Sequence, residues 1–105
     1  MNTADTNTAA VLIAARAIIS DPAMWYQGDW TEAGGWDNND ACCAECAIMR
    51  ASKSLGIIVP DWRFEMRKHT PTNQHIHVFN DCKTTTHADI LAMFDRAIAA
   101  AKVPA

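Results

Sequence analysis

Apolar residues recur at helical spacing near the start of the chain. They lie three or four positions apart from about Thr6 to Ile19, which predicts an amphipathic helix there. The face that this helix would bury consists of Val11, Leu12, Ala15, Ile18 and Ile19. Pro22 limits the helix, because the residue before a proline avoids the helical conformation, and it suits the first turn of a new short helix.

The same spacing predicts a middle helix from Ala41 to Leu55. Asp40 or Asn39 is a suitable N-terminal cap, and Gly56 supplies the stop that helices favour at their C-terminal end. The apolar face of this stretch consists mainly of alanines, so a neighbouring helix can approach it closely. We therefore expect this helix at the centre of the core.

The clearest helix of the pattern follows Thr86 and ends before Pro104. Thr86 and Asp89 form a pair that resembles a capping box, with aspartate in place of the usual glutamate. Five residues of the three predicted helices should be almost fully buried in the folded protein. They are Leu12, Ile48, Leu91, Phe94 and Ile98.

Two stretches between the middle and last helices predict β-strands. Apolar and polar residues alternate from Asp61 to Arg67, the period of a strand with one buried face, although two helical turns remain an alternative. Gln74 to Phe79 also suits a strand, and residues 70–73 have the chemistry of a turn. The predicted fold class is therefore α+β, in a single domain over residues 1–105. It is mostly helical, with about three main helices and a small antiparallel hairpin.

The composition is that of a globular domain. Of the 105 residues, 50% are hydrophobic and 20% are charged, and the net charge is -3. That sign is opposite to the one expected of a protein that binds nucleic acid by neutralising phosphates. No apolar run approaches the ~18 residues of a membrane span, and the first residues do not form a signal peptide. We expect a cytoplasmic protein that binds neither nucleic acid nor a membrane directly.

Three stretches of the chain match a pattern found in other proteins. Residues 16–28 read Arg-Ala-Ile-Ile-Ser-Asp-Pro-Ala-Met-Trp-Tyr-Gln-Gly, and residues 43–48 read Cys-Ala-Glu-Cys-Ala-Ile. Residues 79–98 begin with Phe-Asn-Asp and end with Thr-His-Ala-Asp-Ile-Leu-Ala-Met-Phe-Asp-Arg-Ala-Ile. Together they resemble an uncharacterised family of short bacterial and phage proteins. The chain departs from the pattern of that family at Cys46, Phe79 and Thr85, where glycine, tryptophan and arginine are preferred. The resemblance implies no established activity, and it implies an accessory role rather than a metabolic one.

Cysteine and histidine side chains raise two chemical hypotheses. The set consists of Cys42, Cys43, Cys46, His69, His75, His77, Cys82 and His87. Cys43 and Cys46 with two histidines could hold zinc in a tetrahedral site, and Cys42 or Cys43 at a helix start could act as a nucleophile. Packing is the favoured interpretation, because free cysteine is among the most buried residue types. We therefore expect four reduced, structural thiols and no metal or cofactor.

Charge is segregated along the chain. No basic residue lies between Arg16 and Arg50, and the same stretch holds three of the four tryptophans and the single tyrosine. Tryptophan and tyrosine dominate binding hot spots, and acidic side chains select a basic partner. The binding residues predicted on this basis are Asp29, Trp30, Glu32, Trp36, Asp37 and Asp40. The alternative is that Trp25 and one other tryptophan belong to the core and that the acids are ordinary solvated loop charges.

The sequence therefore favours a protein that binds another protein with a basic surface. It would be a small cytoplasmic, phage-encoded accessory protein, such as an inhibitor of a host defence or nucleic-acid-handling machine. The alternative function is a small-molecule or zinc-binding domain that uses Asn80, Asp81 and the cysteine and histidine set. Apolar residues on the outer face of the first helix, Ile13 and Ala17, leave two alternatives: this helix packs between two others, or it pairs with a second copy of the chain in a homodimer, which we slightly favour.

Overall fold

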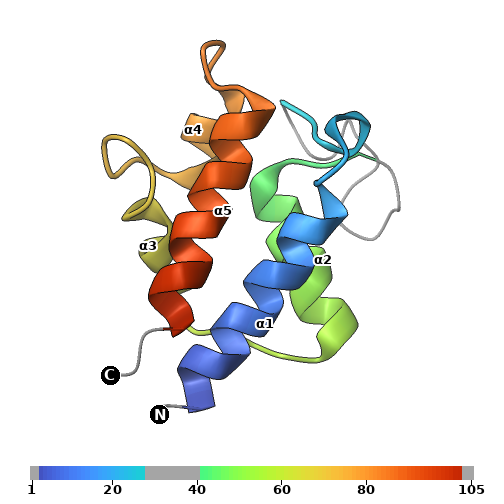
Figure 1. The fold of residues 1–105 in the computed structure, drawn as a ribbon, viewed down its shortest axis with the longest axis vertical. Helices are drawn as coiled ribbons and strands as arrows, with labels where there is room; N and C mark the ends of the chain where they lie inside the picture. The colour runs from blue at the N-terminus through green and yellow to red at the C-terminus, as the bar shows by residue number, and fades with distance from the viewer. Residues whose placement is uncertain (1–2, 28–40, 103–105) are drawn as a thin grey trace.

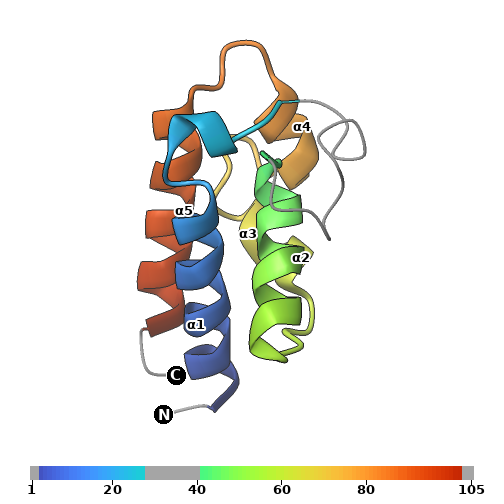
Figure 2. The same cartoon turned by 90° about the vertical axis from the view of Figure 1, so that its right-hand side faces the viewer.

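Helix α1 (Thr3–Ile18) forms the middle of a layer of three helices. The structure is a computed structural model that describes residues 3–27 and 41–102. Helix α2 (Ala44–Leu55) packs on one side of α1 and helix α5 (His87–Lys102) on the other, both antiparallel to α1 (Figure 1). Seen from the side, the three helices run next to one another along most of their length (Figure 2).

Three short helical elements complete the described fold. They are the 3-10 turn η1 (Pro22–Met24), α3 (Trp62–Arg67) and α4 (Ile76–Asp81). Helix α4 contacts α2 and α3, and α3 also contacts α5, so the two short helices link the outer members of the layer. Pro22 opens η1, as its position predicts, and the Asp21 side chain accepts a hydrogen bond from the Ala23 N–H at 2.9 Å.

The core forms where the faces of the three long helices meet. Leu12, Ile48 and Phe94 are buried, as the helical spacing predicts. Leu91 and Ile98 are only partly buried and pack against the margin of this core, so their predicted full burial is wrong. The reason is geometric: an apolar stripe is broader than the line of contact between two helices, and residues at its edges keep some exposure.

The predicted β-hairpin is wrong, and so is the α+β class. The described residues form helices and contain no strand or sheet, with a single isolated bridge between Trp25 and Cys42. In α3 only Met66 is fully buried, Trp62 four residues earlier is half-buried, and Phe64 is 60% exposed. The alternation of three apolar residues therefore arises from an inward pair at helical spacing with an exposed residue between them.

The second predicted strand is also helical. Helix α4 begins at Ile76, and its buried apolar residues Ile76 and Phe79 are three positions apart, while His77 and Val78 are exposed. The turn predicted at residues 70–73 does lie between the two short helices. There the Thr70 hydroxyl donates to the Arg67 carbonyl at 2.8 Å.

Local signals at the helix ends are largely confirmed. Gly56 ends α2 with φ of 67°, a left-handed conformation that glycine adopts without strain. The start of α2 is Ala44 rather than Ala41, and the Cys43 side chain accepts the capping hydrogen bond. The Thr86 and Asp89 side chains each accept a hydrogen bond from the backbone N–H of the other residue, at 3.1 and 2.9 Å, as in a capping box.

The outer face of α1 keeps apolar surface exposed. Ile13 is 46% exposed and Ala17 is exposed, as the helical wheel predicts. Next to them, Arg16 pairs with Asp95 of α5 at 2.7 Å and ties the two helices together. A homodimer through this face stays a prediction. Among the described residues, no helix has the length and apolar character needed to cross a membrane.

We predict that Phe94→Ala destabilises the protein by about 3–5 kcal/mol, because the ring is fully buried and its removal leaves a cavity. That is a large part of the ~5–15 kcal/mol available to a domain. Urea unfolding followed by circular dichroism measures the change. Phe64→Ala is the matched control, since its ring is 60% exposed, and it should change stability by no more than about 0.5 kcal/mol. Equal effects of the two substitutions would contradict this core.

Candidate functional site

The side chain of Asn80 joins three separate parts of the chain. Its Oδ1 accepts hydrogen bonds from Trp25 Nε1 at 2.7 Å and from the Ala44 backbone N–H at 3.0 Å. Its Nδ2 donates to the Tyr26 carbonyl at 3.0 Å and to Asp81 Oδ1 at 2.9 Å. The amide is 0% exposed, and these four bonds use both of its donors and both of its acceptor positions. The amide therefore has no capacity left for a ligand, and its role is to hold the fold.

The side chain of Gln27 contacts the backbone next to Asn80. Its Nε2 lies within hydrogen-bond distance of the carbonyls of Asn80 (3.0 Å), Cys82 (2.9 Å) and Thr85 (3.2 Å). One amide group thus fastens the end of α4 and the connection to α5. We call Asn80, Gln27 and their hydrogen-bond partners the amide joint.

The ring of Trp25 is fixed from several directions. Its indole N–H is bound by Asn80, its backbone forms a bridge with Cys42, and its ring lies 5.7 Å from that of His87 between centroids. His87 in turn places Nε2 at 2.6 Å from the Ile19 carbonyl, so that nitrogen carries the hydrogen. Trp25 therefore has a structural role. This agrees with the alternative interpretation of the sequence, in which Trp25 belongs to the core rather than to a binding surface.

The three stretches that carry the family resemblance meet at the amide joint. Trp25 comes from the first stretch, Ala44 from the second and Asn80 from the third. The alternative function predicted from the sequence uses Asn80 and Asp81 to bind a ligand. The geometry of Asn80 instead indicates a structural role, because its side-chain oxygen accepts a hydrogen bond from the first backbone N–H of α2.

The cysteines and histidines do not assemble into one site. Cys42, Cys43 and Cys46 are buried at the start of α2, whereas Cys82 is exposed after α4. In residues 3–27 and 41–102, no three or more histidine, cysteine, aspartate or glutamate side chains are placed to hold a metal ion. Cys43 and Cys46 of the proposed zinc site do lie close together, but within the described ranges no histidine joins them in an arrangement that could hold a metal ion.

Thiol chemistry also differs between the two locations. Burial, with the nearby Cys46 second, raises the pKa of Cys42 to about 12, and burial raises the pKa of Cys43 and Cys46 as well. These groups stay protonated at neutral pH, which disfavours the proposed nucleophile at the start of α2. The opposite holds for Cys82, whose hydrogen bond with the Thr84 side chain lowers the pKa of its thiol.

The predicted acidic aromatic surface lies outside the described residues. It consists of Asp29, Trp30, Glu32, Trp36, Asp37 and Asp40, all within residues 28–40. Its role in binding therefore stays a prediction from sequence.

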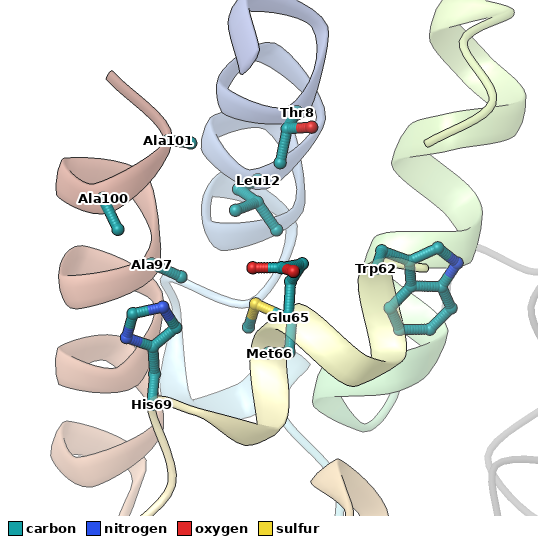
Figure 3. A pocket seen from close by; sticks show the side chains of 9 residues that line it. All are labelled: Thr8, Leu12, Trp62, Glu65, Met66, His69, Ala97, Ala100 and Ala101. Carbon is teal, nitrogen blue, oxygen red and sulfur yellow. The ribbon is translucent and has the colours of Figure 1, made fainter. Parts of the chain in front are cut away.

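A small pocket lies between α1, α3 and α5 (Figure 3). Leu12, Met66 and Ala97 supply its buried apolar surface, and Glu65 and His69 lie on the α3 side. Burial, and secondarily the charge of Arg96, lowers the pKa of His69, so this ring is neutral at neutral pH. With a volume of about 130 Å³, the pocket matches a cavity for one small apolar group. The carboxylate of Glu65, one of the polar groups that line the pocket, is already paired with Lys68 at 3.1 Å.

A larger apolar groove lies where α2 ends and the chain leads into α3. Its volume is about 510 Å³, and we call it the α2–α3 groove. Its lining residues are Met49, Ser52, Lys53, Gly56, Ile57, Ile58 and Trp62. Ile58 is 91% exposed, and Leu55 and Phe64 of the same segment are 46% and 60% exposed. Exposed apolar surface gathered in one segment is typical of an interaction site.

The chain segment that forms this groove has an excess of basic residues. Residues 50–68 contain five basic and two acidic residues, in a chain whose net charge is -3. Lys53 lines the groove, and the Arg63 guanidinium lies 4.2 Å from the centre of the Trp62 ring. The groove was not predicted from the sequence. The available signal was the run Ile57, Ile58, Val59 directly after a helix stop and outside every predicted element.

The described residues thus define a small helical protein with a structural amide joint at one end of α2 and an exposed apolar groove at the other. The chain belongs to a family of unknown function (DUF6197), whose model matches residues 3–100. This match confirms the resemblance to an uncharacterised family. Comparisons with curated proteins and with solved structures gave no match.

We predict that Asn80→Ala lowers the free energy of unfolding by about 3 kcal/mol or more. It leaves the Trp25 indole N–H and the Ala44 N–H without their acceptor, and each buried unpaired group costs about 1–3 kcal/mol. Chemical denaturation measures the loss. Asn7→Ala is the control, because Asn7 is exposed on a helix, where alanine is favoured. An Asn80→Ala protein as stable as this control would show that the joint is not structural.

We further predict that one thiol of the folded protein reacts rapidly with a disulfide reagent and that three react only on unfolding. Cys82 is exposed with a lowered pKa, whereas the other three thiols are buried with raised pKa values. Titration with and without denaturant counts both groups. Cys82→Ser should remove the rapid phase and leave the slow one intact. A rapid phase that survives Cys82→Ser would mean that α2 opens readily at its start.

Proposed function

We propose that this protein acts by binding another protein, as a small cytoplasmic accessory protein rather than an enzyme. The observation that carries the proposal is the α2–α3 groove with Ile58 at 91% exposure. Transfer of a large aliphatic side chain out of water is worth about 1.5–3 kcal/mol. A partner that covers Ile58 gains this free energy, which the folded chain by itself leaves unused.

The position of the groove within the fold supports this role. The groove is formed by the last turns of α2, the connection through Gly56 and the first residue of α3. The Ser52 hydroxyl hydrogen-bonds to the Ile57 carbonyl, and the Ile57 N–H donates to the Ser52 carbonyl at 3.1 Å, so the connection next to Ile58 is held in place. A contact surface on a fixed backbone loses less entropy on binding than one that must first become ordered.

Two further parts of the proposal come from the sequence. The resemblance to short bacterial and phage proteins supports a phage-encoded accessory role, with inhibition of a host defence or nucleic-acid-handling machine as the example. The acidic aromatic residues 29–40 support a second contact, with a basic surface of a partner. The two contacts have opposite charge and lie on different segments, so they can be tested separately.

We predict that Ile58→Asp removes a protein partner that the parent chain retains. Affinity capture from the native host, read by quantitative mass spectrometry, should show at least one protein reduced about tenfold or more, since central interface anchors cost about 2 kcal/mol or more. Val78→Asp is the control: Val78 is an exposed aliphatic residue on α4, 46% exposed, and does not line the groove.

Both variants should keep the melting temperature of the parent within a few degrees, because the replaced side chains are exposed. The proposal fails if the Ile58→Asp and Val78→Asp proteins retain the same partners in the same amounts as the parent chain.

A further inference from the structure

We propose that the segment bound in the α2–α3 groove is an acidic segment of a partner protein that carries large apolar side chains. This inference rests on the proposed function and adds the chemistry of the partner. It follows from the coincidence of an apolar hollow with an excess of positive charge.

The apolar requirement comes from the lining of the groove. Met49, Ile57, Ile58 and Trp62 present hydrocarbon and ring surface. The volume of about 510 Å³ falls within the range of about 300–1,000 Å³ that is typical of ligand pockets. Large side chains of a partner therefore fit into the hollow, and the segment between them lies against the rim.

The acidic requirement comes from the charges next to the groove. Residues 50–68 hold five basic and two acidic residues, whereas the rest of the chain holds four basic and ten acidic ones. Glu45 of α2 pairs with Arg63 at 2.9 Å, and when Glu45 is included the basic residues still outnumber the acidic ones, five to three. A partner with negative charge is thus attracted to this segment, whereas the rest of the chain carries an excess of acidic residues.

Lys53 and Arg63 are placed to act on such a partner. Lys53 lines the groove itself, and the Arg63 guanidinium lies over the ring of Trp62, a residue that lines it. Arg63 keeps 56% of its side chain exposed while it pairs with Glu45, so further N–H groups of its guanidinium can reach a carboxylate.

A hollow surface favours a protein segment over a lipid bilayer. An anionic membrane also attracts a basic and apolar surface, but it presents a broad, even face rather than a narrow segment. The lining residues come from the side of α2, the connection and the start of α3, and together they form an open groove. A protein segment can lie along this groove, and a membrane is one of the outcomes that the test can return.

The experiment is a selection of random twelve-residue peptides displayed on phage against the full-length chain, followed by binding measurements on synthetic copies of the selected peptides. We expect peptides with net negative charge and at least one large apolar residue. Ile58→Asp should abolish their binding, and Val78→Asp should leave it unchanged. Lys53→Glu should weaken it about tenfold, while Lys53→Arg, which keeps the charge, should retain it. Raised salt should weaken binding further, because screening shortens the reach of the charges.

The outcomes separate this inference from the proposed function. Peptides that depend on Ile58 but are neutral or basic, or that are unaffected by Lys53→Glu, overturn the acidic partner and leave protein binding at the groove standing. If no selected peptide depends on Ile58, both proposals fail.

Vesicles of equimolar phosphatidylcholine and phosphatidylserine are the final arm of the test. The chain would float with these vesicles if it bound a lipid surface, and both Ile58→Asp and Lys53→Glu would abolish that flotation. This result, together with no selected peptide that depends on the groove, would overturn the inference in favour of a lipid surface.

Discussion

The saturated amide of Asn80 is the interaction on which the remainder of this structure depends. A buried side chain that uses all four of its hydrogen-bonding positions ties the chain after η1 to the first turn of α2 and to the end of α4. Buried polar groups are costly when unpaired, so a joint of this kind specifies a single arrangement of its parts rather than adding general attraction. Gln27 extends the same constraint to the chain that enters α5.

The amide joint holds the N-terminal end of α2, and the groove lies at the C-terminal end of the same helix. Gly56 turns the chain out of α2, and of the three apolar residues that follow, Val59 is buried, Ile57 packs against the core and Ile58 is exposed. The three-helix layer stays intact through its own contacts between α1, α2 and α5. The molecule thus has a polar, structural end and an exposed, apolar and basic end, and the proposed binding belongs to the second.

These two regions could be predicted from the sequence only in part. Asn80 could be singled out because it lies in one of the stretches that carry the family resemblance. Its role depends on Trp25 and Ala44, which lie 55 and 36 positions away along the chain. No local sequence pattern predicts a hydrogen bond over such a separation. The groove was hidden for another reason: Ile58 belongs to no periodic element, and an apolar residue in a connection is as compatible with burial as with exposure until the neighbouring helices are placed.

The sequence by itself determined the helices whose formation depends on interactions between residues close together in the chain. The long helices α1, α2 and α5 follow from apolar spacing, and the ends of α2 and α5 from Gly56 and the Thr86–Asp89 pair, whose interactions span a few residues. The tertiary structure decided the rest. A six-residue stretch such as Trp62–Arg67 suits a strand or a helix equally by its pattern, and a strand needs a partner strand to bond its backbone. Helix formation satisfies part of that backbone within the stretch itself, and the contacts with α4 and α5, together with the burial of Met66, make the helix the stable outcome.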